Sequence, residues 1–386
     1  MIATITMPRL LYVGGGALAE VTTALFRLGA RRPLIVTDRF MESSGTLARL
    51  TDRLDAASIA WRAFSDTVPD PTSDVVEQGV EALRAAPYDS LIALGGGSPI
   101  DTAKAMSVLA ANGGHMRDYK VPNEIPKLGL PLIAIPTTAG TGSEVTRFTV
   151  ITDSARDEKM LIMGLACCPA AAIVDYELSL SMPWRLTADT GLDSLTHAIE
   201  AYVSRKASPF TDGVAKAAMA LIARNIRTAC HEPNSRAARE AMMLGATQAG
   251  MAFSNASVCL VHGMSRPIGA FFHVPHGLSN AMLLPEITAF SAPAALERYA
   301  DCARAMGVAS EGEGNQAAVA RLVDELRALN RDLKVPTPKE YGLAEARYQE
   351  LLPVMASQAL ASGSPGNNPR VPSADEIVDL YRRVYA

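Results

Sequence analysis

The stretch Thr187-Ala-Asp-Thr-Gly-Leu-Asp-Ser-Leu-Thr-His-Ala-Ile-Glu-Ala-Tyr-Val203 has the pattern of a helix with two metal-binding residue types on one side. Thr187 is predicted as its N-cap, with Asp189 in the first turn, where a negative charge interacts favourably with the helix dipole. Apolar residues recur on one face, whereas Asp193 and His197, four residues apart, lie together on the other. The pair predicts either a solvated polar face or half of a metal site.

The composition indicates a compact protein that acts on small molecules. Hydrophobic residues make up 48% of the 386 residues and charged residues 20%, which is enough apolar material for two domains. The net charge is −4 and no basic cluster occurs, so we expect neither nucleic acid nor an acidic membrane surface as a partner.

Cysteine usage and the N-terminus favour a cytoplasmic setting. The chain has five cysteines without a Cys-x-x-Cys pair, so we expect neither a disulfide framework nor a thiolate zinc site. The N-terminus lacks the regions of a signal peptide, and no apolar run reaches the roughly 18 residues of a membrane span.

The first half of the chain alternates β-rich and helical segments. Strands are predicted at residues 10–13, 34–37, 59–64, 90–94, 132–136 and 172–175, and helices at 17–28, 43–56, 72–85 and 100–111. This alternation predicts a mainly parallel sheet covered by helices on both faces, with ligands at the carboxyl ends of the strands. Residues 1–184 therefore form the predicted α/β dinucleotide-binding domain.

Two glycine-rich turns compete for the phosphates of a nucleotide. Gly14-Gly-Gly-Ala-Leu-Ala19 fits G-x-G-x-x-A after a short strand, and Asp38 follows where a ribose-binding acid would lie. Gly95-Gly-Gly-Ser98 follows a strongly apolar strand and leads directly into a helix. We favour the second turn because the strand before it and the helix after it are the more clearly predicted. Asp38 would accept hydrogen bonds from ribose hydroxyls and repel a 2′-phosphate, which predicts NAD; an ordinary turn aspartate is the alternative.

Beyond Pro183 the pattern becomes helical. Helices are predicted at residues 187–203, 210–230, 235–254, 257–270, 294–306, 314–330 and 373–385. Residues 185–386 thus form a predicted all-α domain. Three of the six histidines, His262, His273 and His276, cluster in one stretch, and Gly263 and Gly277 beside them predict close packing at helix ends.

Longer motifs resemble those of the iron-containing (group III) alcohol dehydrogenases, from about residue 8 to the C-terminus. They are Gly95–Lys104, Pro136–Thr146, Gly191–Glu200, Gly250–Asn255, the stretch from His262 to Gly277, and Asn368-Pro-Arg370. The resemblance implies a dehydroquinate synthase-like fold with a helical metal-binding domain and an active site in the cleft between the domains.

The resemblance also implies roles for individual residues. As ligands of the metal it implies Asp193, His197, His262 and His276. As cofactor contacts it implies Asp38, Gly96, Gly97, Ser98, Thr137, Thr138, Thr141 and Lys159. The Gly14–Gly16 turn is not a cofactor loop in relatives, which agrees with our choice of the second turn. Glu200 and Thr190 share the face of the ligand pair and are candidates only for supporting roles.

Two residues are implied in the substrate pocket, Phe253 and Arg266. Family members often carry a histidine four residues after the third metal ligand, where this chain has Arg266. A guanidinium stays protonated and cannot shuttle protons as imidazole does, so a water or a ribose hydroxyl would carry the substrate proton. Arg266 would either pair with a polar or carboxylate group of the substrate or serve as a structural arginine.

The predicted activity is hydride transfer between NAD and a small primary alcohol or diol, with aldehyde reduction as the reverse reaction. One carboxylate and three imidazoles suit Fe(II), and also Zn(II), Mn(II) or Co(II). Three alternatives stay open: a hydroxyacid-oxoacid transhydrogenase of the same family, a non-redox lyase that uses NAD and a metal as dehydroquinate synthase does, and a protein that binds both without turnover. A homodimer or larger homo-oligomer is also implied; residues 2–13 fit a strand exchanged between subunits or an ordinary first strand.

Overall fold

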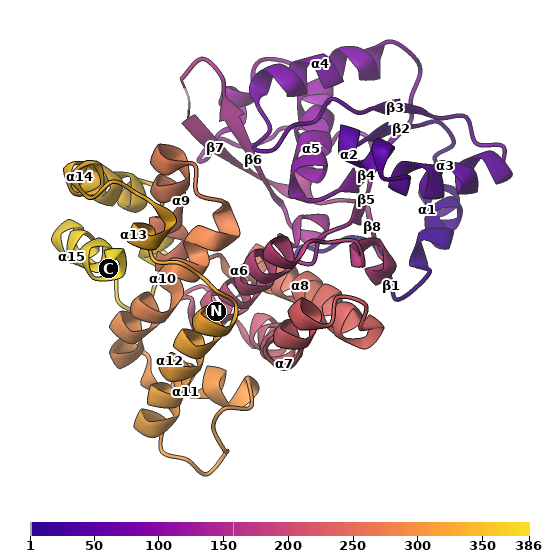
Figure 1. The fold of residues 1–386 in the computed structure, drawn as a ribbon. Coiled ribbons are helices and arrows are strands. Elements are labelled where there is room, and N and C mark those ends of the chain that lie inside the picture. Colours follow the sequence, from indigo (N-terminus) through magenta and orange to yellow (C-terminus); the bar gives the residue numbers. More distant parts are fainter. Residues whose placement is uncertain (1, 157) are drawn as a thin grey trace. The chain divides into compact units, whose positions relative to one another are not determined.

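The computed structural model describes residues 2–156 and 158–386, which divide into two compact units (Figure 1). One unit is Thr4–Ser181, and the other consists of residues 2–3 and Met182–Ala386. The division follows Ser181, near the predicted boundary after residue 184.

The Thr4–Ser181 unit is built on a six-stranded sheet in the order β1-β8-β5-β4-β2-β3. Its strands are β1 (Leu10–Val13), β2 (Pro33–Val36), β3 (Arg62–Phe64), β4 (Ser90–Gly95), β5 (Leu132–Pro136) and β8 (Ala171–Val174). All neighbouring strands pair in parallel, which confirms the predicted parallel sheet.

Helices cover both faces of this sheet (Figure 1). They are α1 (Val21–Arg27), α2 (Arg39–Ser43), α3 (Thr46–Ala56), α4 (Ser73–Arg84) and α5 (Gly97–Asn112). Leu91 and Ala93 of β4 share a buried core with α4 and α5, whereas Ile92 and Leu94 share a second core with α1 and α3. Successive side chains of a strand point to opposite faces, so an almost uninterrupted apolar strand fills both cores.

A two-stranded antiparallel hairpin, β6 (Phe148–Asp153) and β7 (Glu158–Met163), lies outside the sequence prediction. Ile151, Met160 and Ile162 enter the core that contains α5. The segment is short and interrupted by charged residues, so its alternation of apolar and polar residues is a weak signal.

The Met182–Ala386 unit is helical. Its helices are α6 (Trp184–Val203), α7 (Pro209–His231), α8 (Arg236–Ala256), α9 (Leu260–Phe272), α10 (His276–Ser291), α11 (Leu296–Ala305), α12 (Asn315–Asp332), α13 (Pro338–Tyr341), α14 (Glu345–Ala361) and α15 (Ala374–Tyr385). α6 packs against α7, α8 and α10. The predicted combination of an α/β unit and a helical unit is confirmed.

The start of α6 differs from the prediction. The helix begins at Trp184 with Pro183 as its N-cap, so the predicted N-cap Thr187 is wrong. The Thr187 hydroxyl instead donates to the backbone oxygen of Pro183 and accepts a hydrogen bond from Arg239. Asp189 lies in the second turn, where it pairs with Arg185. A proline N-cap supplies no side-chain acceptor, so the sequence signal favoured the nearby threonine.

Two long helices, α10 and α14, lie outside the prediction, as do the short helices α2 and α13. Each long helix contains an interior proline, Pro285 and Pro353, which removes a helical hydrogen bond and argues against a helix in sequence reasoning. Burial overrides that local preference, because Leu283 and Leu284 of α10 and Leu352 of α14 are almost fully buried.

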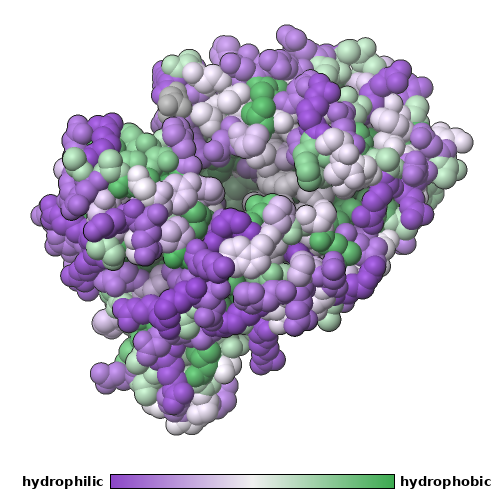
Figure 2. All heavy atoms as spheres, viewed as in Figure 1, coloured by the Kyte–Doolittle hydropathy of each residue, from purple (hydrophilic) through white to green (hydrophobic). Residues whose placement is uncertain are grey.

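The face of the molecule in Figure 2 is mainly polar. On the face that Figure 2 shows, hydrophilic side chains cover most of the area and apolar ones occur in small groups. Within the described residues, no helix combines the length and the apolar character that crossing a membrane requires.

Candidate metal centre and nucleotide site

Two predicted metal ligands lie on α6. Asp193 and His197 are only 3% and 5% exposed. The solvated polar face, one of the two readings of this pair, is therefore wrong. The face is buried because α9 and α10 cover it while Leu192 and Leu195 pack on the other side.

The other two ligands lie at the beginnings of α9 and α10. His262 is in the first turn of α9, and His276 is the first residue of α10. α10 approaches α6 closely at Gly277, where a Cβ would lie 2.5 Å from the backbone oxygen of Asp189. The close packing that was predicted at this glycine is confirmed, and it brings His276 to Asp193.

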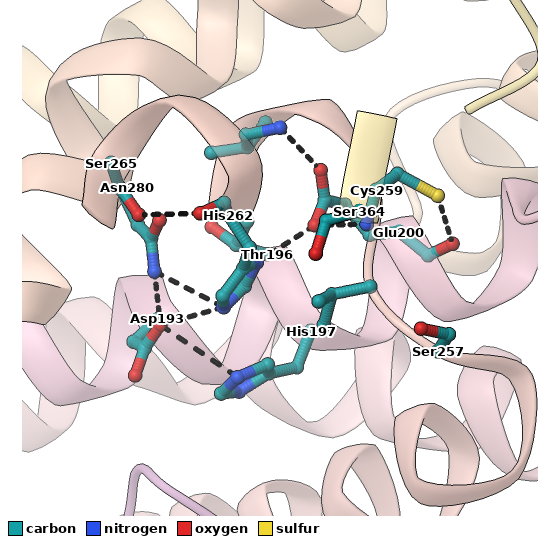
Figure 3. A network of polar contacts seen from close by, with 12 residues as sticks. Asp193, Thr196, His197, Glu200, Ser257, Cys259, His262, Ser265, Asn280 and Ser364 are labelled. Atoms are coloured by element: carbon teal, nitrogen blue, oxygen red, sulfur yellow. Dashed lines mark hydrogen bonds and ion pairs between the residues drawn. The ribbon is translucent and has the colours of Figure 1, made fainter. Parts of the chain in front are cut away.

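The four side chains converge on one point. Nε2 atoms of His262, His276 and His197 lie 3.5, 3.8 and 4.0 Å from Oδ1 of Asp193, and one ligand atom of each residue lies within 4.8 Å of all the others. Figure 3 shows Asp193, His197 and His262 pointing toward one another. Four ligands at about 2.1 Å from an ion in tetrahedral array lie about 3.4 Å apart, so the spacing fits a divalent metal.

Asn280, on the second turn of α10, also meets these atoms. Its Nδ2 donates to Oδ1 of Asp193 at 2.7 Å and lies 3.1 and 3.2 Å from Nε2 of His262 and His276. One amide nitrogen thus faces a carboxylate oxygen and two imidazole nitrogens at once. The three ligand atoms therefore point at one common position.

The pKa values of His197 and His262 shift in opposite directions, so positive charge is favoured at one of these rings and not at the other. Burial lowers the pKa of His197 to about 3. Burial acts in the same direction on His262, but the carboxylates of Asp193 and Glu200 outweigh it and raise the pKa of His262 to about 8. Burial opposes ionisation of Asp193, yet the neighbouring imidazoles, His197 and His276 foremost, hold its pKa well below the usual value. The site stabilises positive charge next to the two carboxylates.

Glu200 has a larger role than the sequence indicated. Its Oε2 lies 2.7 Å from Nδ1 of His262 and accepts from the backbone N–H of Cys259 (Figure 3). Its Oε1 accepts from the N–H of Val261. The carboxylate therefore fixes the ring of His262 and the first turn of α9 together. The signal was in the sequence, since residue 200 continues the helical face of residues 193 and 197.

The turn that Glu200 holds is strained. Ser257, directly after α8, has φ 68° and ψ 168°, a conformation that residues with a side chain rarely adopt. Asn367 stabilises the turn by donating to the Ser257 hydroxyl and to the backbone oxygen of Val258, both at 3.0 Å. This strained connection between α8 and α9 is what places His262.

The two predicted pocket residues adjoin the ligands. The ring of Phe253 stacks on that of His197 at a centroid distance of 4.1 Å. Arg266 is one helical turn beyond His262, is partly buried, and donates to the Ser364 hydroxyl at 3.2 Å.

In the Thr4–Ser181 unit, the predicted nucleotide contacts gather at one edge of the sheet. Asp38, Gly96 and Thr137 follow β2, β4 and β5, which are neighbours and parallel. The carboxyl ends of such strands form the usual ligand edge of a doubly wound sheet. Asp38 caps α2 by accepting from the N–H of Met41 at 2.9 Å through one oxygen, Oδ1.

The turn at Gly95–Ser98 is shaped for close approach by a ligand. α5 begins at Gly97, so the N–H groups of its first turn have no partner within the helix. A Cβ on Gly97 would lie 2.9 Å from Cγ2 of Thr141, and one on Gly96 would lie 3.4 Å from Cγ2 of Thr138. The absence of side chains on these glycines therefore lets the two threonines pack directly against the start of α5, whose free N–H groups suit a pyrophosphate.

The Gly14–Gly16 turn satisfies its own amides. The N–H groups of Gly16 and Leu18 donate to the two carboxylate oxygens of Asp175 at 3.1 Å, and Asp175 is fully buried. A carboxylate of the protein already occupies the anion position of this turn. The preference for the second turn therefore has a physical reason.

A buried polar cluster ties the threonine loop to α5. Nζ of Lys104 donates to the Ser143 hydroxyl and to the backbone oxygens of Thr146 and Phe148, at 2.7–3.0 Å. The Ser143 hydroxyl in turn donates to Asp101 at 2.6 Å. Asp101 and Lys104 belong to the Gly95–Lys104 motif, yet the sequence analysis assigned them no role.

Lys159 lies on β7 and its ammonium pairs with Asp70 at 2.7 Å. No contact in the described residues joins it to the glycine turn, so its predicted role at the cofactor stays a prediction.

Comparisons with known proteins agree on the family. The family model described as iron-containing alcohol dehydrogenase matches residues 8–176, and that of the C-terminal part of the Fe-containing alcohol dehydrogenase family matches residues 187–385. Lactaldehyde reductase of Escherichia coli (strain K12) is 39% identical over 377 residues, covering 97% of each chain. NAD-dependent methanol dehydrogenase of Bacillus methanolicus is 38% identical over 371 residues, covering 96% of each.

Solved structures give the same result. The crystal structure of a 1,3-propanediol oxidoreductase matches with a TM-score of 0.96 and 33% identity, covering 100% of both chains. Similarity of this extent, over both units and with full-length relatives, places the chain in the iron-containing alcohol dehydrogenase family.

Proposed function

We propose that the protein is an NAD- and metal-dependent alcohol dehydrogenase that interconverts a small primary alcohol or diol and its aldehyde. The observation that carries this proposal is the convergence of Asp193 with three imidazoles within 4.8 Å. Small alcohols, diols and aldehydes are also the compounds in the names of lactaldehyde reductase, methanol dehydrogenase and 1,3-propanediol oxidoreductase.

Asp193, His197, His262 and His276 would hold the metal, for which we propose Fe(II), with Zn(II), Mn(II) and Co(II) also suited to the donor set. A bound divalent cation would lower the pKa of an alcohol and polarise an aldehyde carbonyl as a Lewis acid. Glu200 keeps His262 oriented, and Phe253 covers the ring of His197. The side chain of His276 is 46% exposed, which marks the open side of the cluster for the substrate.

The proposed cofactor is NAD. The N–H groups of Gly96, Gly97 and Ser98 would bind the pyrophosphate, and Thr137, Thr138 and Thr141 would add contacts from the adjoining loop. The free oxygen of Asp38 would accept from ribose hydroxyls and repel the 2′-phosphate of NADP. Lys159 would leave Asp70 to reach the cofactor.

A substrate panel tests this proposal. Protein stripped of metal and reconstituted with Fe(II) or Zn(II) is offered ethanol, propanediols, lactaldehyde and hydroxy acids, with NAD or NADP. We expect NADH formation with small primary alcohols or diols, and Asp38→Ala should narrow the preference for NAD over NADP. Inactivity on every compound with metal bound would contradict the proposal and favour a lyase or a protein without turnover.

The remaining expectations are also proposals. We assign residues 1–184 to dinucleotide binding and residues 185–386 to metal and substrate binding. A cytoplasmic homodimer or larger homo-oligomer is the proposed state, and light scattering on the purified protein measures its assembly.

A further inference from the structure

Arg266 occupies the same face of α9 as the metal ligand His262, one helical turn further on. Residues four apart on a helix have Cβ atoms about 5–6 Å apart, and helical side chains lean toward the N-terminus. The guanidinium is therefore directed back along α9 toward the ligand cluster. The hydrogen bond to Ser364 agrees with this direction, because the next residue, Pro365, packs against Gly263 beside His262.

The guanidinium has unused hydrogen-bonding capacity. Arginine carries five N–H donors, and within residues 2–156 and 158–386 the hydrogen bond to the Ser364 hydroxyl is the one that Arg266 makes. Burial lowers the pKa of Arg266 and Glu200 opposes that effect, but a guanidinium remains charged at any working pH. A partly buried cation with a single neutral partner requires further acceptors from water or a ligand.

Three other arginines of the same unit, each partly or fully shielded from solvent, have more hydrogen-bond or ion-pair partners than Arg266. Arg298 pairs with Asp212, and Arg227 pairs with both Glu325 and Asp332. Fully buried Arg239 donates to three oxygen acceptors. Arg266 differs from these structural arginines, which weakens the reading that it only supports the fold.

Glu200 does not neutralise Arg266 through a hydrogen bond. Its two oxygens accept from the N–H groups of Cys259 and Val261 and face the ring of His262. Asp193 and Glu200 bring two negative charges, whereas a divalent cation and Arg266 would bring three positive ones. The loaded site would thus carry one excess positive charge in a partly desolvated place.

We propose that Arg266 binds an anionic group of the substrate, so that the preferred substrates are small hydroxy acids and the corresponding oxo acids. This inference rests on the proposed dehydrogenase function and names its substrate class. The guanidinium matches a carboxylate with two parallel N–H···O bonds. Because one helical turn separates Arg266 from His262, the carboxylate and the carbinol carbon lie at opposite ends of the substrate, as in 3-hydroxypropanoate or 4-hydroxybutanoate.

The reaction balances without another reactant. The carbinol carbon gives a hydride to the nicotinamide, the hydroxyl proton goes to solvent, and the hydroxy acid with NAD⁺ becomes the aldehyde acid with NADH and H⁺. The carboxylate stays intact and serves only for binding.

A pair of nearly isosteric substrates tests the inference. 4-Hydroxybutanoate and neutral 4-hydroxybutanamide differ at the group that Arg266 would bind. We expect kcat/KM of the wild type to favour the acid by at least about 10-fold, the lower range for a hydrogen-bonded charge pair. Arg266→Met should bring the ratio of kcat/KM for the acid to kcat/KM for the amide down to about 1, and Arg266→Lys should retain part of the preference. Ser364→Ala keeps the charge and should keep the preference.

Binding of unreactive butanoate, measured by calorimetry, is the second readout. It should be detectable for wild type and Ser364→Ala and weakened at least about 10-fold in Arg266→Met. An acid preference or butanoate affinity that survives in Arg266→Met overturns the inference, as does a wild type that prefers the amide. Activity on neutral diols separates the two proposals, because its presence without acid preference leaves the dehydrogenase function standing.

Discussion

The glycine turn at Gly95–Ser98 is suited to bind its ligand through backbone groups, whereas the cluster around Asp193 is suited to bind a metal through side chains. The turn offers backbone N–H groups at the start of α5 and is formed by consecutive residues. The cluster offers side-chain lone pairs from α6, α9 and α10, over residues 193–276. The first site depends on glycines, which have no side chain to block the approach of a ligand. The second depends on a hydrogen-bond network that orients the side chains of the metal ligands. Substitutions should therefore separate nucleotide binding from metal binding.

Asp193→Ala should have the largest effect. It removes the only carboxylate of the four-residue cluster, whose oxygen lies within 4.0 Å of a nitrogen of each imidazole. We expect metal content and alcohol oxidation to be lost together, with turnover down at least about 100-fold, while NAD affinity stays within about 2-fold. Metal analysis and fluorescence titration with NADH measure the two properties. Normal metal content in this variant would remove Asp193 from the ligand set.

Glu200→Gln should weaken the metal site without removing a ligand. The amide of glutamine has one accepting oxygen in place of the two carboxylate oxygens. Either His262 or the first turn of α9 therefore loses its partner. Loss of such a supporting group lowers metal affinity by about 10–100-fold. Competition with a chelator measures that affinity. Thr190→Ala is the matched control, because within residues 2–156 and 158–386 its hydroxyl donates to the backbone oxygen of Leu186 in its own helix and to no other group.

Gly97→Ala should act on the nucleotide alone. The new Cβ would lie 2.9 Å from Cγ2 of Thr141 and displace this predicted cofactor contact, so we expect KM for NAD to rise about 10-fold with metal content unchanged. Gly213→Ala, with nothing within 4 Å of the added Cβ, controls for the loss of a helical glycine. Adding Thr141→Ser removes the clashing methyl group and should restore part of the affinity. Failure of that rescue would place the nucleotide elsewhere.

Asp175→Asn should give the smallest effect on function and sharpen the contrast between the two glycine turns. The carboxylate accepts from the N–H groups of Gly16, Leu18 and Glu177, and an asparagine can replace only part of this. We expect a loss of about 1–3 kcal/mol in stability, seen as a lower unfolding temperature, with NAD affinity unchanged. A selective loss of NAD affinity would show that the first turn binds the cofactor after all.

Local patterns were sufficient for the parallel sheet and its two helical layers. The central strands are nearly continuous apolar runs between turn residues, and that pattern has few other solutions. The hairpin of β6 and β7 and the helix α10 were missed, because a short charged hairpin and a helix with Pro285 are decided by tertiary packing.

For the metal centre, the Asp193–His197 pair was ambiguous on its own. Its burial depends on α9 and α10, and the spacing of one helix does not contain that information. The family motifs supplied the four ligands, whereas the supporting network of Glu200, Asn280 and the strained Ser257 became visible only through long-range contacts. The choice between the two glycine turns was made from the elements that flank them. The structure gives the physical reason, because the carboxylate of Asp175 already accepts from the N–H groups of the first turn.

The most direct test of the metal centre is a titration of metal-stripped protein with Fe(II), followed by NADH formation from a small primary alcohol or hydroxy acid. We predict no activity in the stripped protein and a rise that ends at one ion per chain, with no such rise in Asp193→Ala. Full activity without metal, or an unchanged titration in Asp193→Ala, would contradict the account.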